Sequence, residues 1–145
     1  ENLITIAYDS MWNGTRTLAE AIAEGIKQKD PDVEVKLLNT AKRDKNDVIT
    51  EIFASKGFLL GSPTINKGIL TSVASLIEEV KGLKFKGKKA AAFGTYGWSG
   101  ESIKRLTEGL ESCGFEIVND GFSALWNPDD ESIERARSFG AVLPK

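Results

Sequence analysis

Short apolar runs alternate along this chain with longer stretches in which apolar residues recur every three or four positions. The run LITIAY at residues 3–8 is short, rich in Ile and almost wholly apolar, which is typical of a buried strand. After it, Leu18, Ile22 and Ile26 lie four residues apart, so they share one face of a helix. Strands are predicted at residues 3–8, 33–38, 57–61, 89–96 and within 115–126, and helices at about 15–29, 44–55, 69–82, 103–114 and 128–142.

This alternation of strands and helices predicts a single α/β domain over residues 1–145. Helices should cover both faces of a five-stranded parallel sheet and form a three-layer sandwich. The commonest strand order for such a sheet is 2-1-3-4-5. Residues 33–38 alternate between apolar and polar before turning apolar, which favours an edge strand. Asn127 and Pro128 have the types typical of an N-cap and a first helical residue.

Ligands of such sheets bind outside the carboxyl ends of the strands, where the strand order reverses. In this chain that point lies between the first and third strands. The loops at residues 9–15, 62–68 and 95–100 follow the first, third and fourth strands, and all three are rich in Gly, Ser, Thr and Asn. We therefore expect the ligand site to be built from these three loops.

The first loop has the composition of a phosphate site. Ser10, Asn13 and Thr15 offer hydrogen-bond donors, and Gly14 lets the backbone approach a ligand closely. A helix that begins at Thr15 would add unpaired N–H groups and the positive end of its dipole. The same residue types also occur at an ordinary capped helix start, and that alternative stays open.

The other two loops have the composition of a flavin site. Trp98 is the expected stacking ring for a planar cofactor, with Tyr96 and Trp12 as the next candidates. Hydroxyls and backbone amides of residues 62–68 could bond a ribityl chain or a ring edge. Packing of Trp98 against a neighbouring helix, and a generic strand-to-helix connection at 62–68, are the structural alternatives.

The composition excludes several kinds of chemistry. The chain has no His, so histidine-based acid–base catalysis and imidazole metal sites are absent. Its formal net charge of −2 gives no reason to expect nucleic-acid binding, and no apolar run is long enough to span a membrane. The single Cys113 fits a reducing, cytoplasmic compartment and should be a small buried residue.

The three loop sequences resemble those of the flavodoxin family, and most closely the flavodoxin-like domain of flavodiiron proteins (A-type flavoproteins, such as flavorubredoxin). The matching motifs are YDSMWNGTR, GSPTINKG and AAAFGTYGWSGE. The resemblance implies FMN as cofactor, with its phosphate in the first loop and its isoalloxazine ring between the other two. The implied cofactor-binding residues are Ser10, Met11, Trp12, Asn13, Gly14, Thr15, Ser62, Pro63, Thr64, Ile65, Asn66, Gly68, Thr95, Tyr96, Gly97, Trp98, Ser99 and Gly100.

The resemblance also implies a longer parent protein. Flavodiiron proteins carry a metallo-β-lactamase-like domain whose di-iron site reduces dioxygen or nitric oxide. A rubredoxin-like donor or a flavin reductase supplies electrons to FMN, and the parent is a homodimer or homotetramer in which FMN serves the partner subunit's irons. Because the first strand starts almost at residue 1 without an initiator Met, we expect a segment of such a protein.

The expected role is therefore electron transfer, with no protein nucleophile, acid–base pair or metal site. A free-standing FMN-dependent quinone or NAD(P)H oxidoreductase is the alternative. A phosphoacceptor signalling domain is disfavoured because Asp9 has no acidic neighbour and the third strand ends without an Asp. The basic run at residues 84–89 should be a solvated loop at the opposite end of the sheet, with docking of an acidic donor as the alternative.

Overall fold

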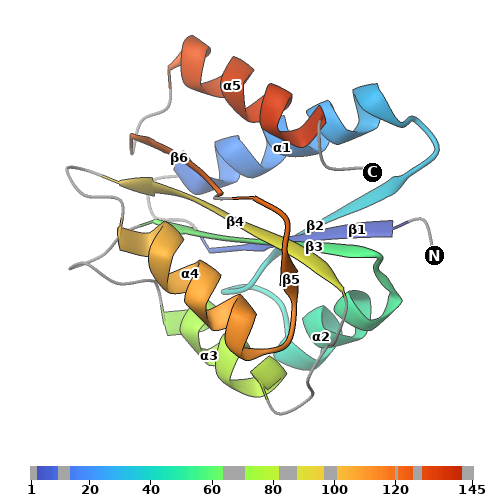
Figure 1. The fold of residues 1–145 in the computed structure, drawn as a ribbon, viewed down its shortest axis with the longest axis vertical. Coiled ribbons are helices and arrows are strands. Elements are labelled where there is room, and N and C mark those ends of the chain that lie inside the picture. Colours follow the sequence, from blue (N-terminus) through green and yellow to red (C-terminus); the bar gives the residue numbers. More distant parts are fainter. Residues whose placement is uncertain are drawn as a thin grey trace.

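A computed structural model describes residues 3–9, 14–63, 71–81, 88–96, 101–119, 121–125 and 129–141. In it, α1 and α5 cover one face of a central sheet, and α2, α3 and α4 cover the other (Figure 1). The elements are β1 (Leu3–Tyr8), α1 (Gly14–Lys29), β2 (Glu34–Asn39), α2 (Lys45–Ala54), β3 (Gly57–Pro63), α3 (Thr71–Lys81), β4 (Lys89–Tyr96), α4 (Glu101–Ser112), β5 (Glu116–Ile117), β6 (Phe122–Leu125) and α5 (Asp130–Ala141).

The sheet is parallel and has the order β2-β1-β3-β4-β5, which confirms the predicted topology. The central strand β1 pairs with both β2 and β3, so that Ile6 lies between Leu37 and Leu59. Strand β2 lies at the edge, as its alternating sequence predicted, and its residues are more exposed than those of β1. A strand that is covered by helices on both faces can be apolar almost throughout, as β1 is. The edge strand β2 is less covered, which explains why its residues are more exposed and partly polar.

The expected fifth strand is divided into two short strands, and both pair with β4. Gly121 lies between them with φ near +90°, a conformation that glycine adopts at little cost. Its N–H donates to Asn119 Oδ1 at 2.8 Å, which closes a tight turn. A Cβ at Gly121 would lie 2.7 Å from the Ala92 carbonyl oxygen. The turn therefore interrupts the ladder where a continuous strand was predicted.

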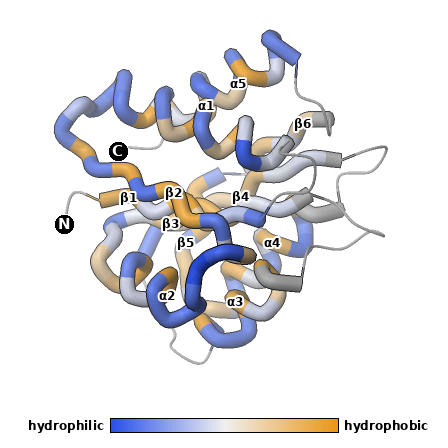
Figure 2. Tube along the Cα trace, turned by 180° about the vertical axis from the view of Figure 1, so that it is seen from behind, coloured by the Kyte–Doolittle hydropathy of each residue, from blue (hydrophilic) through white to orange (hydrophobic). Residues whose placement is uncertain are grey.

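Two apolar clusters fill the space between the sheet and its helices. Figure 2 shows the apolar residues gathered toward the sheet and the polar ones on the outer faces of the helices. Ala91 belongs to the cluster under α1 and α5, whereas Ala90 and Ala92 belong to the cluster under α2, α3 and α4. Cys113 is 1% exposed in the second cluster, which confirms that it is a small buried residue.

The last helix begins later than its sequence suggested. It starts at Asp130, and Asp129 caps it by accepting the Ser132 N–H at 2.8 Å on Oδ1 and the Ile133 N–H at 3.0 Å on its carbonyl. Asn127 and Pro128, the expected cap and first helical residue, lie outside the described residues. A carboxylate at this position also interacts favourably with the helix dipole, which favours Asp129 as the cap.

No described helix has the length and apolar content that a membrane crossing requires.

Candidate functional site

The carboxyl ends of β1, β3 and β4 lie at one edge of the sheet, beside the first turn of α1 (Figure 1). Six of the predicted site residues lie in the described part of the chain at this edge: Gly14, Thr15, Ser62, Pro63, Thr95 and Tyr96. The others fall outside the described residues: Ser10, Met11, Trp12, Asn13, Thr64, Ile65, Asn66, Gly68, Gly97, Trp98, Ser99 and Gly100.

Strand register places the ends of the three strands at one level. Gly61 of β3 is level with Tyr8 of β1 on one side and with Phe93 of β4 on the other. Asp9 continues the ladder by donating its N–H to the Gly61 carbonyl at 3.2 Å. Ser62 follows Gly61 and is fully buried. The ends of β1, β3 and β4, from which the three predicted loops start, therefore lie side by side.

A hydrogen bond joins the first predicted loop to the third. The Oγ1 atoms of Thr15 in α1 and Thr95 in β4 lie 3.1 Å apart, although 80 positions separate the two residues. Thr15 is 0% exposed and Thr95 is 1% exposed, so water does not compete for either hydroxyl. The structure thus brings together two predicted cofactor residues from different loops.

The first turn of α1 has the charge that a phosphate requires. It contains no acidic residue, whereas α2 has Asp47 in its first turn and Asp44 as its cap, and α5 has Asp129 as its cap. Arg16 in this turn is half exposed and pairs with Glu20 at 3.3 Å. A buried hydroxyl in a first helical turn that contains no acidic residue is a donor set that fits a phosphate.

Two further residues organise this edge, and neither is among the site residues predicted from the sequence. Thr40 directly follows β2, and its N–H and hydroxyl both donate to the Tyr8 carbonyl, at 2.7 Å and 3.3 Å. Tyr8 is 7% exposed, and burial raises the pKa of its phenol, while nearby Arg16 opposes that shift. Tyr8 is the last residue of a predicted strand and Thr40 lies two residues after another, so their position near the carboxyl ends of strands was the available signal.

The basic run is described only at Lys88 and Lys89. Lys88 Nζ donates to the carbonyls of Phe53 and Ser55, at 3.1 Å and 2.6 Å. It thereby supplies hydrogen-bond donors to carbonyl groups at the C-terminal end of α2. The ammonium of Lys88 therefore has a structural partner. The solvated loop was expected over residues 84–89, of which residues 84–87 lie outside the described residues. Among the described residues, no group of three Asp, Glu or Cys side chains could hold a metal ion.

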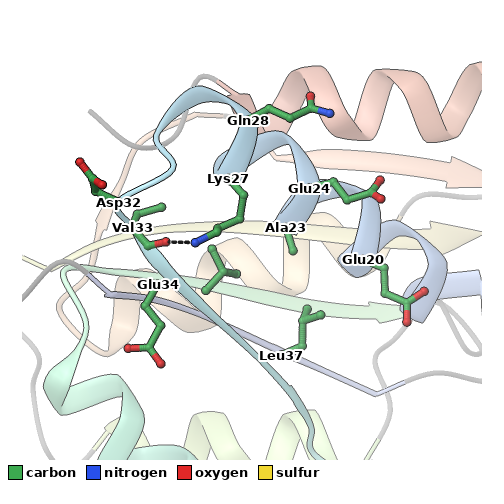
Figure 3. Close-up of a pocket in the computed structure, with 10 residues that line it drawn as sticks. Glu20, Ala23, Glu24, Lys27, Gln28, Asp32, Val33, Glu34 and Leu37 are labelled. Carbon is green, nitrogen blue, oxygen red and sulfur yellow. Dashed lines mark hydrogen bonds between the residues drawn. The ribbon is translucent and has the colours of Figure 1, made fainter.

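A shallow groove of about 790 Å³ runs between α1 and the edge strand β2 (Figure 3). Its charged groups are largely engaged already. Lys27 Nζ donates to the carbonyls of Pro31 and Val33, and Glu24 pairs with Arg137 at 2.7 Å. None of the six predicted site residues that the structure describes lines this groove.

A parallel sheet of the order β2-β1-β3-β4-β5 with helices on both faces places this chain in the class of flavodoxin-like α/β domains. The chain belongs to the flavodoxin family, whose model matches residues 6–140. FMN is the cofactor of this domain, and the residues at the described edge fit its phosphate.

Curated relatives of the chain are longer proteins. The anaerobic nitric oxide reductase flavorubredoxin of Aliivibrio fischeri is 46% identical over 145 residues, which is all of this chain and 29% of that protein. The protein of the same name from Escherichia coli O1:K1 is also 46% identical, and the match covers 30% of it. The chain thus spans less than a third of the length of these relatives.

Solved structures of flavodiiron proteins and flavodoxins are also similar to this chain. Rubredoxin oxygen:oxidoreductase from Desulfovibrio gigas matches with a TM-score of 0.92 and 33% identity, over 99% of this chain and 35% of that one. The flavodiiron protein of Giardia intestinalis matches with a TM-score of 0.93 and 28% identity, over 99% and 36%. An archaeal flavodoxin matches with a TM-score of 0.87 and 25% identity, over 98% and 96%. The relatives do not favour the alternative of a free-standing quinone or NAD(P)H oxidoreductase.

Proposed function

We propose that this chain is the FMN-carrying electron-transfer module of a flavodiiron protein. In the complete protein, a metallo-β-lactamase-like domain would hold the di-iron site that reduces nitric oxide or dioxygen. A rubredoxin-like protein or a flavin reductase would supply the electrons. The match to about 30% of each flavorubredoxin supports a parent with further domains. A homodimer or homotetramer would bring the FMN of one subunit to the irons of the other.

The observation that carries this proposal is the hydrogen bond between Thr15 and Thr95. It joins the start of α1, which is suited to a phosphate, to the end of β4, where the third loop begins. A free phosphate would need only the first of these elements. A flavin mononucleotide needs both, because its phosphate and its ring are far apart on one molecule.

We assign the cofactor contacts to the three loops. The phosphate would be held by Ser10, Met11, Asn13, Gly14 and Thr15, with Trp12 beside the ring. Backbone amides of the second and third loops would bond the ring edge, and Trp98 would stack on the ring and exclude water. The ring contacts would come from Ser62, Pro63, Thr64, Ile65, Asn66 and Gly68, and from Thr95, Tyr96, Gly97, Trp98, Ser99 and Gly100.

Bound FMN would supply the redox chemistry, since it can accept and release one or two electrons. The protein's own residues would bind it, orient it and keep water from its ring. No proton transfer by a protein side chain is required, in agreement with the absence of His.

Titration of FMN into the apoprotein tests the cofactor site, with flavin fluorescence as the measurement. We expect quenching that saturates at one FMN per chain, and full emission at micromolar protein would contradict the proposal. The carrier role is tested separately by adding NAD(P)H to the loaded protein. We expect no steady oxidation until a donor reductase is added, whereas turnover by the protein alone would favour a free-standing oxidoreductase.

A further inference from the structure

We propose that Thr95 is a positioning residue that acts on the FMN phosphate through Thr15. In this arrangement the Thr95 hydroxyl donates to Thr15 Oγ1, and the Thr15 hydroxyl donates its own proton to the phosphate. The inference rests on the proposed FMN site, and it gives the side chain of Thr95 a task other than contact with the ring.

The number of protons in the hydroxyl pair is the first argument. Two threonine hydroxyls carry two protons, and the bond of 3.1 Å between them uses one. Within the part of the chain that the structure describes, the pair has no third hydrogen-bond partner. Both side chains are at least 99% buried, so the second proton needs an acceptor other than bulk water.

A second buried hydroxyl pair shows how a purely structural network closes. Thr5 Oγ1 and Ser55 Oγ lie 2.5 Å apart, and Ser55 Oγ donates onward to the Glu51 carbonyl at 2.6 Å. That network ends on a carbonyl of the protein itself. Among the described residues, the Thr15–Thr95 pair has no such end, and it lies beside the helix start that suits an anion.

The strand position of Thr95 suits it to hold Thr15 in place. Its Cα is level with Pro63 of β3 on one side and with Ala124 of β6 on the other, so β4 is paired on both edges there. Its β-branched side chain has few rotamers. Thr15 lies in the first turn of α1, where the backbone N–H groups have no partner within the helix. A residue whose strand is paired on both edges thus orients a hydroxyl at the start of α1.

Comparison of FMN with riboflavin, which lacks the phosphate, tests this role in the intact chain. For Thr95→Val we expect FMN to bind about tenfold more weakly, the effect of losing about one hydrogen bond, and riboflavin within about twofold of the wild type. Thr95→Ser keeps the hydroxyl and should restore FMN binding. Thr5→Val is the matched control, because it removes the other buried hydroxyl pair and should leave the ratio of the two affinities unchanged.

A double mutant tests whether Thr95 acts through Thr15. If it does, Thr95→Val should have no further effect on FMN affinity in a Thr15→Val background. Additive effects, or equal loss of FMN and riboflavin in Thr95→Val, would overturn the inference and leave the FMN site intact. Failure of the wild type to bind FMN would instead overturn the proposed function. If Thr95→Val does not fold, Thr95→Ala serves for the same comparison.

Discussion

Gly25 of α1 lies directly against the backbone carbonyl of Arg137 in α5, with no room for a side chain between them. A second glycine, Gly140 of α5, lies in the same way against the carbonyl of Ile22 in α1. The two helices can therefore approach at backbone distance on one face of the sheet (Figure 1). This packing buries Ile22 and Ile26 and holds in place the helix whose first turn forms the candidate phosphate site.

Gly25→Ala should destabilise the protein, although alanine is the better helix former. A Cβ at this position overlaps the Arg137 carbonyl, and overpacking of this kind costs about 1–3 kcal/mol. Urea unfolding measures the change, with the exposed Gln28→Ala in the same helix as the control. A gain of about 1 kcal/mol, as helix propensity alone would give, would contradict the close packing.

Cys113 should make the protein less stable in alkaline solution. Burial raises the pKa of its thiol above the ordinary value of 9.0, so the unfolded chain loses the proton first. The contribution of the protonated thiol to the free energy of unfolding is fully present below pH 9, and it is lost as the pH rises through the pKa of the folded state. Chemical unfolding at a series of pH values should show this decline, and Cys113→Ala should make it shallower. Part of the decline that remains should come from Tyr8, because burial also raises the pKa of its phenol.

The cap of α5 should make stability sensitive to acid. The Ser132 backbone N–H bonds the Asp129 carboxylate and holds its pKa below the ordinary value of 3.8. The contribution of the ionised cap is therefore present above pH 3.8 and is lost as the pH falls through the folded pKa. Asp129→Asn should keep the cap and weaken the pH dependence, whereas Asp129→Ala should lower the melting temperature at neutral pH. Equal melting temperatures for the two variants would contradict the capping role.

Trp98→Ala should weaken FMN binding by about 1 kcal/mol or more, through loss of stacking and of buried area. Fluorescence titration measures the dissociation constant. Phe53→Ala is a suitable control, because this aromatic residue is 57% exposed and its carbonyl bonds Lys88 at the opposite end of the sheet. An unchanged constant in Trp98→Ala would remove this residue from the site.

The topology was accessible from the sequence because the order of strands and helices follows from local periodicity. Apolar runs such as LITIAY identify buried strands, and spacings such as Leu18, Ile22 and Ile26 identify the helices between them. The connection rules for parallel strands then leave few arrangements, and the order 2-1-3-4-5 places the ends of the first, third and fourth strands next to one another. The alternation in residues 33–38 was sufficient to identify the edge strand.

Only the tertiary structure decided which distant groups meet. The division of the last strand depends on Gly121, whose positive φ and contact with Ala92 are not visible in an apolar pattern. The glycine contacts between α1 and α5, and the hydrogen bond between Thr15 and Thr95, join residues far apart in the chain. Periodicity reports which face of an element is buried. The position of one atom against another depends on how the elements pack, and that is a property of the whole fold.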